Sequence, residues 1–343
     1  MSGMIDKSSV SDRTPLASVI IVTWNAKRYV EECLCSLREN VEVPIEIIVV
    51  DNASFDGTAE LVRDRFPEAC LIEATENLGF AKGNNLGIAH SRGKYLFLVN
   101  SDVKVPPGCV SKLICCMEAN PSVGMLGPQM LGPDGKVRRS IMRRPVLWSL
   151  FCRALALDSI FRGRRWTGGF LMSDFGHDRT CDVEVLNGWF WVVRREALEQ
   201  VGLLDDRFFM YGEDMDWSYR FRKAGWRLVF YAEAGAIHYG GASSAAAPVR
   251  FYIEMQRANF QYWRKHHGWL SFLAYYCITI LHEVVRIAGH AGIYLLKPGA
   301  RRDAAYKVRR SSATLRWLIE GADCTAEFGQ LRADSTANTI QQS

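Results

Sequence analysis

The chain has 343 residues, of which 48% are hydrophobic and 23% charged, and its formal net charge is +5. This length allows one large domain or two smaller ones that fold unaided, and the composition excludes a disordered chain. The small net charge, with no arginine-rich tail or nucleic-acid-binding motif, argues against DNA or RNA as a partner.

The cysteine pattern and the N-terminus both favour a cytoplasmic protein. The ten cysteines include pairs such as Cys33 and Cys35 that are too close for a routine disulfide, and there is no CxxC pair that would suggest zinc. Residues 1–14 are polar and lack an apolar signal core. We therefore expect reduced thiols, a disordered lead-in at 1–14 and a disordered tail at 324–343.

Strands and helices are predicted to alternate over the first hundred residues. Runs of β-branched and apolar residues predict strands at 17–22, 45–50, 70–73 and 95–99. Helices are predicted at 26–40, from residue 58 and at 81–90, and Asp56 or Ser54 is the expected N-cap of the second. Such alternation predicts a parallel sheet with right-handed crossovers.

Polar clusters follow three of these strands. The apolar run in Lys94–Asp102 (KYLFLVNSD) stops at Asn100-Ser101-Asp102, and the other clusters are Thr23–Asn25 and Asp51–Ser54. Because the carboxyl ends of parallel strands share one edge, the three clusters should gather there, as in a nucleotide site. Asp102 suits binding of a divalent cation together with substrate phosphates, and a loop or capping role is the alternative.

The middle of the chain predicts further elements and one basic segment. A helix at 109–118 precedes strands at 123–126, 183–193 and 227–231, with a short helix at 196–201, and Asn187-Gly188 breaks the strand pattern of 183–193. A further helix within 207–226 should end at Gly225 as its C′ residue. The segment Arg138–Arg165 has eight arginines and one acidic residue. It is either a solvated loop and helix, or a basic-aromatic surface facing anionic lipid or a phosphate-bearing acceptor.

The last hundred residues are predicted to be helical. An amphipathic pattern covers 250–267, and the nearly apolar run Trp269–Leu281 ends before His282 and Glu283. This run is shorter than the ~20 residues of a spanning helix, so an interfacial or buried helix is favoured over a transmembrane one. The basic run Arg301–Arg310 suits an anionic membrane surface. We expect 246–323 to form a membrane-associating or oligomerising extension.

Four residues are candidates for chemistry, and each has a structural alternative. Asp51 suits contact with a base or ribose, or the capping of a turn. His238 suits metal ligation, or is a satisfied core histidine. Glu213 and Asp214 stand beside aromatic residues, where desolvation and mutual repulsion would raise a carboxyl pKa toward that of a general base. Their alternative role is to stabilise a helix N-terminus.

Four ordered blocks of sequence resemble the family 2 glycosyltransferases. They are SVIIVTWNAKRYVEECLCSL, EIIVVDNASFDGTAELV, NLGFAKGNNLGIAHSRGKYLFLVNSD and RFFMYGEDMDWSYRFRKAGWRLVFYAEAGAIHYGG, within about 16–243. Within the family the chain is most similar to the rhamnosyltransferase-like branch of cell-surface polysaccharide enzymes. The resemblance implies a GT-A fold, which is a Rossmann-like α/β fold with a mostly parallel sheet. It also implies a nucleotide-sugar donor, Mg²⁺ or Mn²⁺, and inversion at the anomeric carbon.

The resemblance also implies boundaries and residue roles. The glycosyltransferase domain would cover 15–245, with a nucleotide-sugar half at about 15–130 and an acceptor half at about 180–245. Donor contacts would come from Thr23, Trp24, Asn25, Asp51, Asn77, Gly79, Asn84, Asn100, Ser101 and Asp102. Asn100-Ser101-Asp102 matches the DXD motif with its first aspartate replaced, and Asp102 and His238 would hold the metal. Asp214 would be the base, and Glu213 would bind the acceptor or hold Asp214.

The resulting expectation is an inverting glycosyltransferase at the inner face of the cytoplasmic membrane. Its first-guess donor is dTDP-rhamnose, its acceptor is a saccharide or polyprenyl-linked saccharide, and a homo-oligomer is allowed. Alternatives are another donor, such as UDP-galactofuranose or a UDP-hexose, or a non-catalytic nucleotide-sugar-binding subunit. A nicotinamide enzyme on a similar sheet is disfavoured, because Thr23–Lys27 after the first strand contains no glycine.

Overall fold

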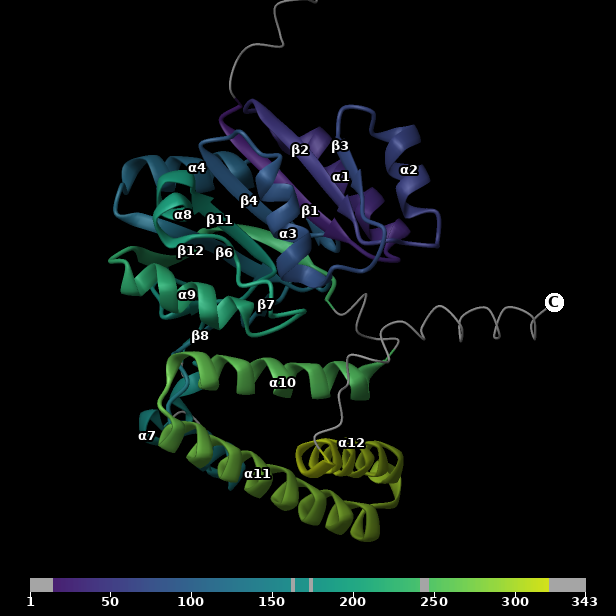
Figure 1. Cartoon of the computed structure of the whole chain (residues 1–343), viewed down its shortest axis with the longest axis vertical. Coiled ribbons are helices and arrows are strands. Elements are labelled where there is room, and N and C mark those ends of the chain that lie inside the picture. Colours follow the sequence, from purple (N-terminus) through teal and green to yellow (C-terminus); the bar gives the residue numbers. More distant parts are fainter. Residues whose placement is uncertain (1–14, 162–163, 173–174, 241–246, 321–343) are drawn as a thin grey trace, which may run out of the picture.

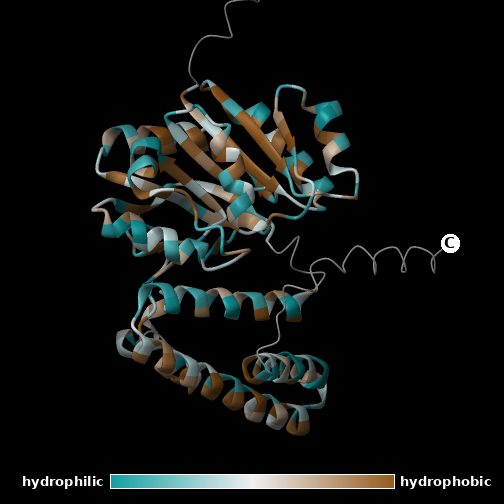
Figure 2. Ribbon diagram, viewed as in Figure 1, coloured by the Kyte–Doolittle hydropathy of each residue, from teal (hydrophilic) through white to brown (hydrophobic). Residues whose placement is uncertain are grey.

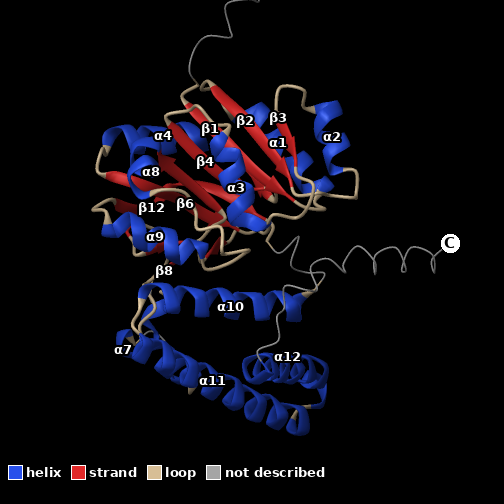
Figure 3. Ribbon diagram, in the orientation of Figure 1, coloured by secondary structure: helices blue, strands red, loops and turns tan. Residues whose placement is uncertain are grey.

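The computed structural model describes residues 15–161, 164–172, 175–240 and 247–320 (Figure 1). An α/β part with a central sheet lies against a helical part whose three long helices come from the end of the chain (Figure 3). The predicted lead-in at 1–14 and tail at 324–343 lie outside the described residues. The site described below lies in the α/β part and borders the helical part.

The central sheet is mixed, with a parallel half that begins the chain. Its strands, in spatial order, are β3 (Cys70–Glu73), β2 (Ile45–Asp51), β1 (Ala17–Thr23), β4 (Tyr95–Asn100), β11 (Phe190–Arg194), β6 (Val123–Leu131), β12 (Arg227–His238) and β5 (Val103–Lys104). The first four are parallel, as predicted, whereas β11 runs antiparallel to both β4 and β6. The registers Thr23↔Asp51 and Val22↔Asn100 bring the predicted polar strand ends to one edge.

Helices cover both faces of the sheet. On one face α1 (Lys27–Asn40), α2 (Thr58–Arg65) and α4 (Cys109–Ala119) pack in one buried cluster, and on the other face α3 (Gly79–Ala89), α8 (Arg195–Val201) and α9 (Glu213–Lys223) pack in a second. Val19 and Ile21 of β1 belong to the first cluster and Ile20 belongs to the second. Because side chains alternate along a strand, a strand buried on both faces is apolar at every position.

Most predicted elements form within a few residues of their expected bounds, with two informative differences. The N-cap of α2 is Gly57 in a left-handed conformation rather than Asp56 or Ser54, although Asp56 Oδ1 accepts the Thr58 N–H at 3.1 Å. The strand predicted at 227–231 continues as β12 to His238. This extension carries the histidine to the edge of the sheet where the polar clusters lie.

The helical part consists of α10 (Pro248–His266), α11 (Trp269–Leu296) and α12 (Arg301–Glu320), with a contribution from the middle of the chain. The basic segment forms α5 (Leu147–Ala154), α6 (Leu157–Ile160) and α7 (Arg165–Gly168), and α5 packs directly against α11. Part of this segment is therefore packed rather than a solvated loop. The two open interpretations of its arginines are taken up below.

Helix α11 is longer than its apolar sequence run predicted. It continues through His282 and Glu283 for 28 residues in all, and among the described helices it is the one long and apolar enough to cross a membrane. Only 17% of its most apolar stretch is buried inside the protein, so it is not a buried core helix. Hydrophobic residues line much of its length (Figure 2).

Candidate active site

A cavity of about 340 Å³ opens where β1 and β4 end. The chain leaves β1 toward β2 and β3 and returns on the other side of β1 at β4, so the direction of winding reverses between these two strands. Open α/β sheets bind their ligands at such a switch point. Ten predicted site residues line the cavity: Thr23, Trp24, Asn77, Gly79, Asn100, Ser101, Asp102, Glu213, Asp214 and His238.

Asp102 and His238 are in direct contact on the cavity wall. His238 Nε2 lies 3.1 Å from Asp102 Oδ1, while the Gly240 N–H donates to Asp102 Oδ2 at 3.0 Å. The Tyr239 N–H also donates to the backbone carbonyl of Asp102 at 3.0 Å, so the end of β12 is tied to the end of β4. The ring of Trp189 packs against His238 with centroids 5.5 Å apart.

The donor atoms of this pair fit a divalent cation that also binds a substrate. A carboxylate oxygen and an imidazole nitrogen face the cavity together, and Asn100 and Ser101 add further oxygen atoms beside them. Within the described ranges no group of three or more His, Cys, Asp or Glu side chains gathers to hold a metal. An ion here would complete its shell with diphosphate oxygens or water, as Mg²⁺ commonly does, and a mixed nitrogen and oxygen set also suits Mn²⁺.

Asp214 and Glu213 face the cavity with unequal pKa values. Burial raises the pKa of Asp214 to about 6, and the Met215 N–H donates to its Oδ1 at 2.8 Å. Burial and the neighbouring Asp214 charge raise the pKa of Glu213 well above its usual range, and Glu213 is 5% exposed. Because the charge of Asp214 opposes ionisation of Glu213, Asp214 is the member of the pair that ionises first as pH rises. Two adjacent carboxyl groups held apart in this way can act as a base and a hydrogen-bond donor.

The backbone before α9 aims this pair of carboxyl groups into the cavity. Tyr211 and Gly212 both have a positive φ, of 66° and 75°, and helix α9 begins at the next residue. At Gly212 a Cβ would lie 3.0 Å from Ala258 of α10, so the turn also needs glycine for space. The first turn of the helix thus combines an acidic pair with a turn geometry that few sequences adopt.

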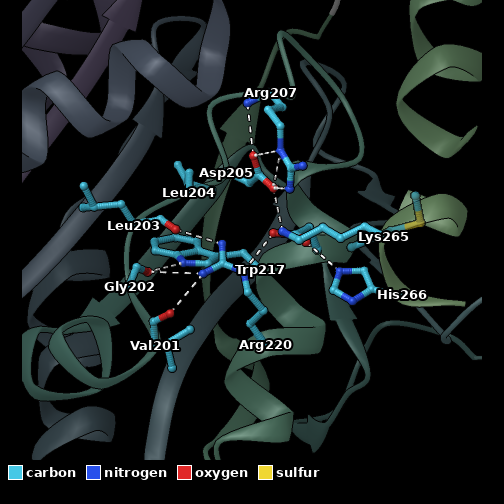
Figure 4. Close-up of polar contacts among 12 residues, drawn as sticks. Val201, Gly202, Leu203, Leu204, Asp205, Arg207, Trp217, Arg220, Lys265 and His266 are labelled. Atoms are coloured by element: carbon cyan, nitrogen blue, oxygen red, sulfur yellow. Dashed lines mark hydrogen bonds and ion pairs between the residues drawn. The ribbon is translucent and has the colours of Figure 1, made fainter. Parts of the chain in front are cut away.

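Asp216 holds α9 on α10 and takes no part in the cavity. Its buried carboxylate meets Arg220 at 2.8 Å, His266 at 2.6 Å and Lys265 at 2.5 Å. Lys265 also reaches Asp205 at 2.6 Å (Figure 4). The hydrogen bond with His266 and the charges of Arg220 and Lys265 hold the pKa of Asp216 below its usual value despite its burial. Of these three neighbouring acidic residues, Glu213 and Asp214 face the cavity and Asp216 is structural.

The edge formed by β1 and β2 has polar atoms without partners. Asp51 Oδ2 accepts the Ser54 N–H at 2.9 Å, whereas Asp51 Oδ1, Thr23 Oγ1 and Asn52 Oδ1 are buried without a hydrogen bond to any described residue. Burial raises the pKa of Asp51. Unsatisfied buried oxygens beside a cavity fit a ligand that supplies donors, such as a nucleobase or ribose.

Other predicted donor residues shape the loops around the cavity. The Asn25 amide oxygen accepts the Phe55 N–H at 2.9 Å, and the Asn84 side chain donates to the Phe80 carbonyl within α3, so neither side chain lines the cavity. Asn77 Oδ1 accepts the Gly79 N–H at 2.9 Å. Gly79 has φ +78°, and a Cβ there would lie 2.4 Å from the Phe209 carbonyl oxygen. The backbone that approaches Gly79 closely is therefore that of the 207–212 loop.

Sequence patterns did not indicate several residues of the cavity wall. Asn52, Asn187, Trp189, Met130 and Phe251 all line it. Asn187 and Trp189 come from the turn between β10 (Val185–Leu186) and β11, which the sequence predicted only as a break in a strand. Phe251 comes from α10, so the helical part contributes to the cavity. Asn52 belongs to the predicted polar cluster Asp51–Ser54, so its position next to Asp51 was the sequence signal that could have identified it.

Comparison with known proteins identifies the relatives of this chain. The sequence profile described as glycosyl transferase family 2 matches residues 18–202. The N-acetylglucosaminyl-diphospho-decaprenol L-rhamnosyltransferase of Mycobacterium tuberculosis is 30% identical over 268 residues, which cover 75% of this chain and 87% of that protein. The O-antigen biosynthesis protein RfbC of Myxococcus xanthus is 24% identical over 76% of this chain and 19% of its own length.

A solved mannosyltransferase from Pyrobaculum calidifontis, in complex with GDP-Man and Mn²⁺, aligns with a TM-score of 0.49 at 19% identity, over 96% of this chain and 81% of its own. The mostly parallel sheet, with its cavity at the switch point, has the GT-A fold of nucleotide-sugar transferases. The chain belongs to glycosyl transferase family 2, and it is a glycosyltransferase.

Proposed function

We propose that this glycosyltransferase transfers rhamnose with inversion from dTDP-rhamnose to a polyprenyl-diphosphate-linked saccharide in cell-wall polysaccharide synthesis. The observation that carries the proposal is the position of Asp214 and the Asp102–His238 pair on the walls of one cavity. This arrangement supports Asp214, with a pKa of about 6, as a base in the same cavity as the proposed cation and diphosphate site.

The donor would occupy the half of the cavity formed by the strand ends. Thr23, Asp51 and Asn52 have the unsatisfied oxygens that a base or ribose would satisfy. Asn100 and Ser101 border the site of the diphosphate, and Asp102 with His238 would hold Mn²⁺ or Mg²⁺. When bound, such an ion neutralises charge on the departing nucleoside diphosphate.

Asp214 would remove the proton from the acceptor hydroxyl as it attacks the face of the sugar opposite the leaving group. One carboxylate suffices, because the leaving diphosphate does not need the protonation that a glycosidase supplies with its second acid. Glu213, whose pKa lies well above the usual carboxyl range, would hydrogen-bond to the acceptor or to Asp214. Asp214 thereby has the role of base and Glu213 an orienting role.

The choice of donor and acceptor rests on the named activity of the Mycobacterium tuberculosis relative. A lipid-linked acceptor also fits the surface of the helical part. Trp269, Leu295 and Leu296 of α11 are each more than two-thirds exposed. The exposed Arg301, Arg302 and Arg309 of α12 add positive charge on the neighbouring helix. An apolar face beside basic residues suits peripheral binding at the anionic inner face of the cytoplasmic membrane.

A donor screen tests the proposal. The purified full chain would be given dTDP-rhamnose, UDP-galactofuranose and UDP-hexoses in turn, with a polyprenyl-diphosphate-N-acetylglucosamine acceptor in detergent and with or without Mg²⁺ or Mn²⁺. We expect nucleotide release and product only from dTDP-rhamnose, and none from the Asp214→Asn variant. Product from a UDP-sugar alone would overturn the choice of donor. Product from none of them would favour a non-catalytic sugar-nucleotide-binding subunit.

A further inference from the structure

A second group of charged residues lies inside the helical part, away from the strand ends. Arg153 of α5, Arg286 of α11 and Arg310 of α12 form what we term the arginine cluster. Arg310 lies over the ring of Tyr252, whose hydroxyl donates to Glu283, three residues before Arg286 on α11. The charges of all three arginines also act on His282, so the three guanidinium groups lie in one region between these helices. Three separate segments of sequence thus supply arginine to one interior location.

The arginine cluster has more hydrogen-bond donors than acceptors. Glu283 of α11 is fully buried beside it, and Tyr252 of α10 donates to Glu283 Oε1 at 2.8 Å. The Nε atoms of Arg286 and Arg310 are buried without a hydrogen-bond partner among the described residues, as is the second carboxylate oxygen of Glu283, and this one acceptor is fewer than the donors of three guanidinium groups require. Buried guanidinium nitrogens without acceptors are unfavourable, so the site is suited to an anion that supplies oxygens.

The electrostatic environment is positive despite Glu283. Burial and the charges of Arg286 and Arg153 lower the pKa of His282 to about 4, so this imidazole is neutral near pH 7 and does not change the charge of the cluster. Asp158 acts on Arg153 from the same segment of chain. The carboxylates of Glu283 and Asp158 thus supply two negative charges against three positive guanidinium groups. A bound anion would neutralise the remaining positive charge.

The arginine cluster adjoins the sugar-transfer cavity through consecutive residues of α10. Phe251 lines the cavity, and the ring of the next residue, Tyr252, lies 4.0 Å from the guanidinium carbon of Arg310. Helix α10 lies between the α/β part and the pair α11 and α12, so its residues contact both the cavity and the cluster (Figure 1). The exposed apolar face of α11 belongs to the same helical part as the arginine cluster.

We propose that the arginine cluster binds the diphosphate of the lipid-linked acceptor, with the saccharide in the cavity on the Phe251 side of α10. This inference rests on the proposed function, because it assumes an acceptor that carries a diphosphate. Arginine suits the task because its planar fork binds phosphate oxygens in pairs. The prenyl chain would then lie along the apolar face of α11 toward the membrane. The basic segment around α5 is, in this view, part of the acceptor site.

The test compares two acceptors on the full-length enzyme in detergent, with saturating dTDP-rhamnose. One acceptor is polyprenyl-diphosphate-N-acetylglucosamine, and the other is an octyl glycoside of N-acetylglucosamine, which has no phosphate. Loss of a charged hydrogen bond to phosphate should raise the KM for the diphosphate acceptor about 10- to 100-fold in Arg310→Ala and Arg286→Ala. Activity on the octyl glycoside and the KM for the donor should not change. Arg316→Ala, which removes an exposed charge from α12, is the matched control and should leave every parameter unchanged.

A second variant separates anion binding from a purely structural ion cluster. Glu283→Gln removes the negative charge that competes with a bound diphosphate, so we expect its KM for the diphosphate acceptor to stay equal or fall. If Glu283 only neutralises the arginines within the fold, Glu283→Gln would instead lose thermal stability and activity on both acceptors, which would overturn the inference. Equal losses on both acceptors in the arginine variants would also overturn it.

Two further experiments ask whether the cluster binds bulk anionic lipid instead of the acceptor, and whether a negative result concerns this inference or the proposed function itself. Co-sedimentation with phosphatidylglycerol vesicles should be the same for Arg310→Ala and the wild type. Weaker binding of the variant would assign the cluster to bulk anionic lipid and contradict the inference. If the wild-type enzyme has the same KM for the octyl glycoside as for the diphosphate acceptor, the diphosphate adds no binding, so the arginine inference fails while the proposed glycosyl transfer stands. If it uses neither, the proposed function itself fails.

Discussion

The pH dependence of transfer tests the assignment of Asp214 as the base. Because the pKa of Asp214 lies at about 6, its ionised fraction should be about 0.1 at pH 5 and about 0.9 at pH 7. Only the ionised form accepts a proton, so activity should rise with pH through this range. We expect kcat/KM for the acceptor to rise by about fivefold from pH 5 to pH 6, by about twofold more to pH 7, and to level off above pH 7.

The measurement is the initial rate of nucleotide release at saturating donor and metal, between pH 5 and pH 8. Asp214→Asn should lower the plateau by about 10²- to 10⁴-fold, which is the usual contribution of a positioned base. Glu213→Gln is the matched comparison, since it removes the neighbouring carboxyl group but leaves Asp214 in place, and it should keep the rise near pH 6. A rate independent of pH from 5 to 7.5, or an Asp214→Asn variant with full activity, would refute the reasoning.

Three further predictions concern metal, backbone and packing. Asp102→Ala should remove the dependence of donor affinity on Mn²⁺ in calorimetry, and an unchanged affinity with metal would contradict the site. Gly79→Ala should lower the free energy of unfolding by about 3 kcal/mol in urea titrations, because a Cβ there meets the Phe209 carbonyl. Gly108→Ala, with φ +73° and open space, should cost only about 1 kcal/mol. Asp216→Asn should destabilise the fold by about 3 kcal/mol above pH 4. Its lowered pKa means that the wild type loses this advantage as pH falls below 4, and equal unfolding energies at pH 7 would contradict it.

The elements that formed as predicted are those specified by local sequence. The β1 and β4 runs are apolar at nearly every position, and the polar residues after them mark the carboxyl edge without any knowledge of tertiary contacts. Gly225 ends the region of α9 with φ +91°, as its position after a helical pattern predicted. Local signals of this kind do not depend on what the element packs against.

The features that sequence could not predict depend on distant contacts. The extension of β12 to His238 includes an irregularity between Tyr231 and Gly235, where the period-two pattern is lost, so periodicity marked only its first half. Trp189 enters the site because a short turn places it beside His238. The packing of α5 on α11 joins segments more than a hundred residues apart, and neither amphipathic pattern specifies its partner.

The proposed domain limits at 15–245 and 246–323 remain predictions. Phe251 of α10 lines the cavity, and α5 packs on α11, so the helical part shares residues and contacts with the catalytic part. We therefore expect the isolated α/β part to lose acceptor binding before it loses donor binding. If a chain truncated after residue 245 bound both the donor and the acceptor as tightly as the full chain does, this coupling would be contradicted.

The central claim is direct displacement of the nucleoside diphosphate by an acceptor hydroxyl that Asp214 deprotonates. The most direct measurement is the anomeric configuration of the product, read by nuclear magnetic resonance after transfer from dTDP-rhamnose to the lipid-linked acceptor. The account predicts a single product whose configuration is opposite to that of the donor, formed by the wild type and absent with Asp214→Asn. A product that retains the configuration of the donor, or that forms equally well without Asp214, would contradict it.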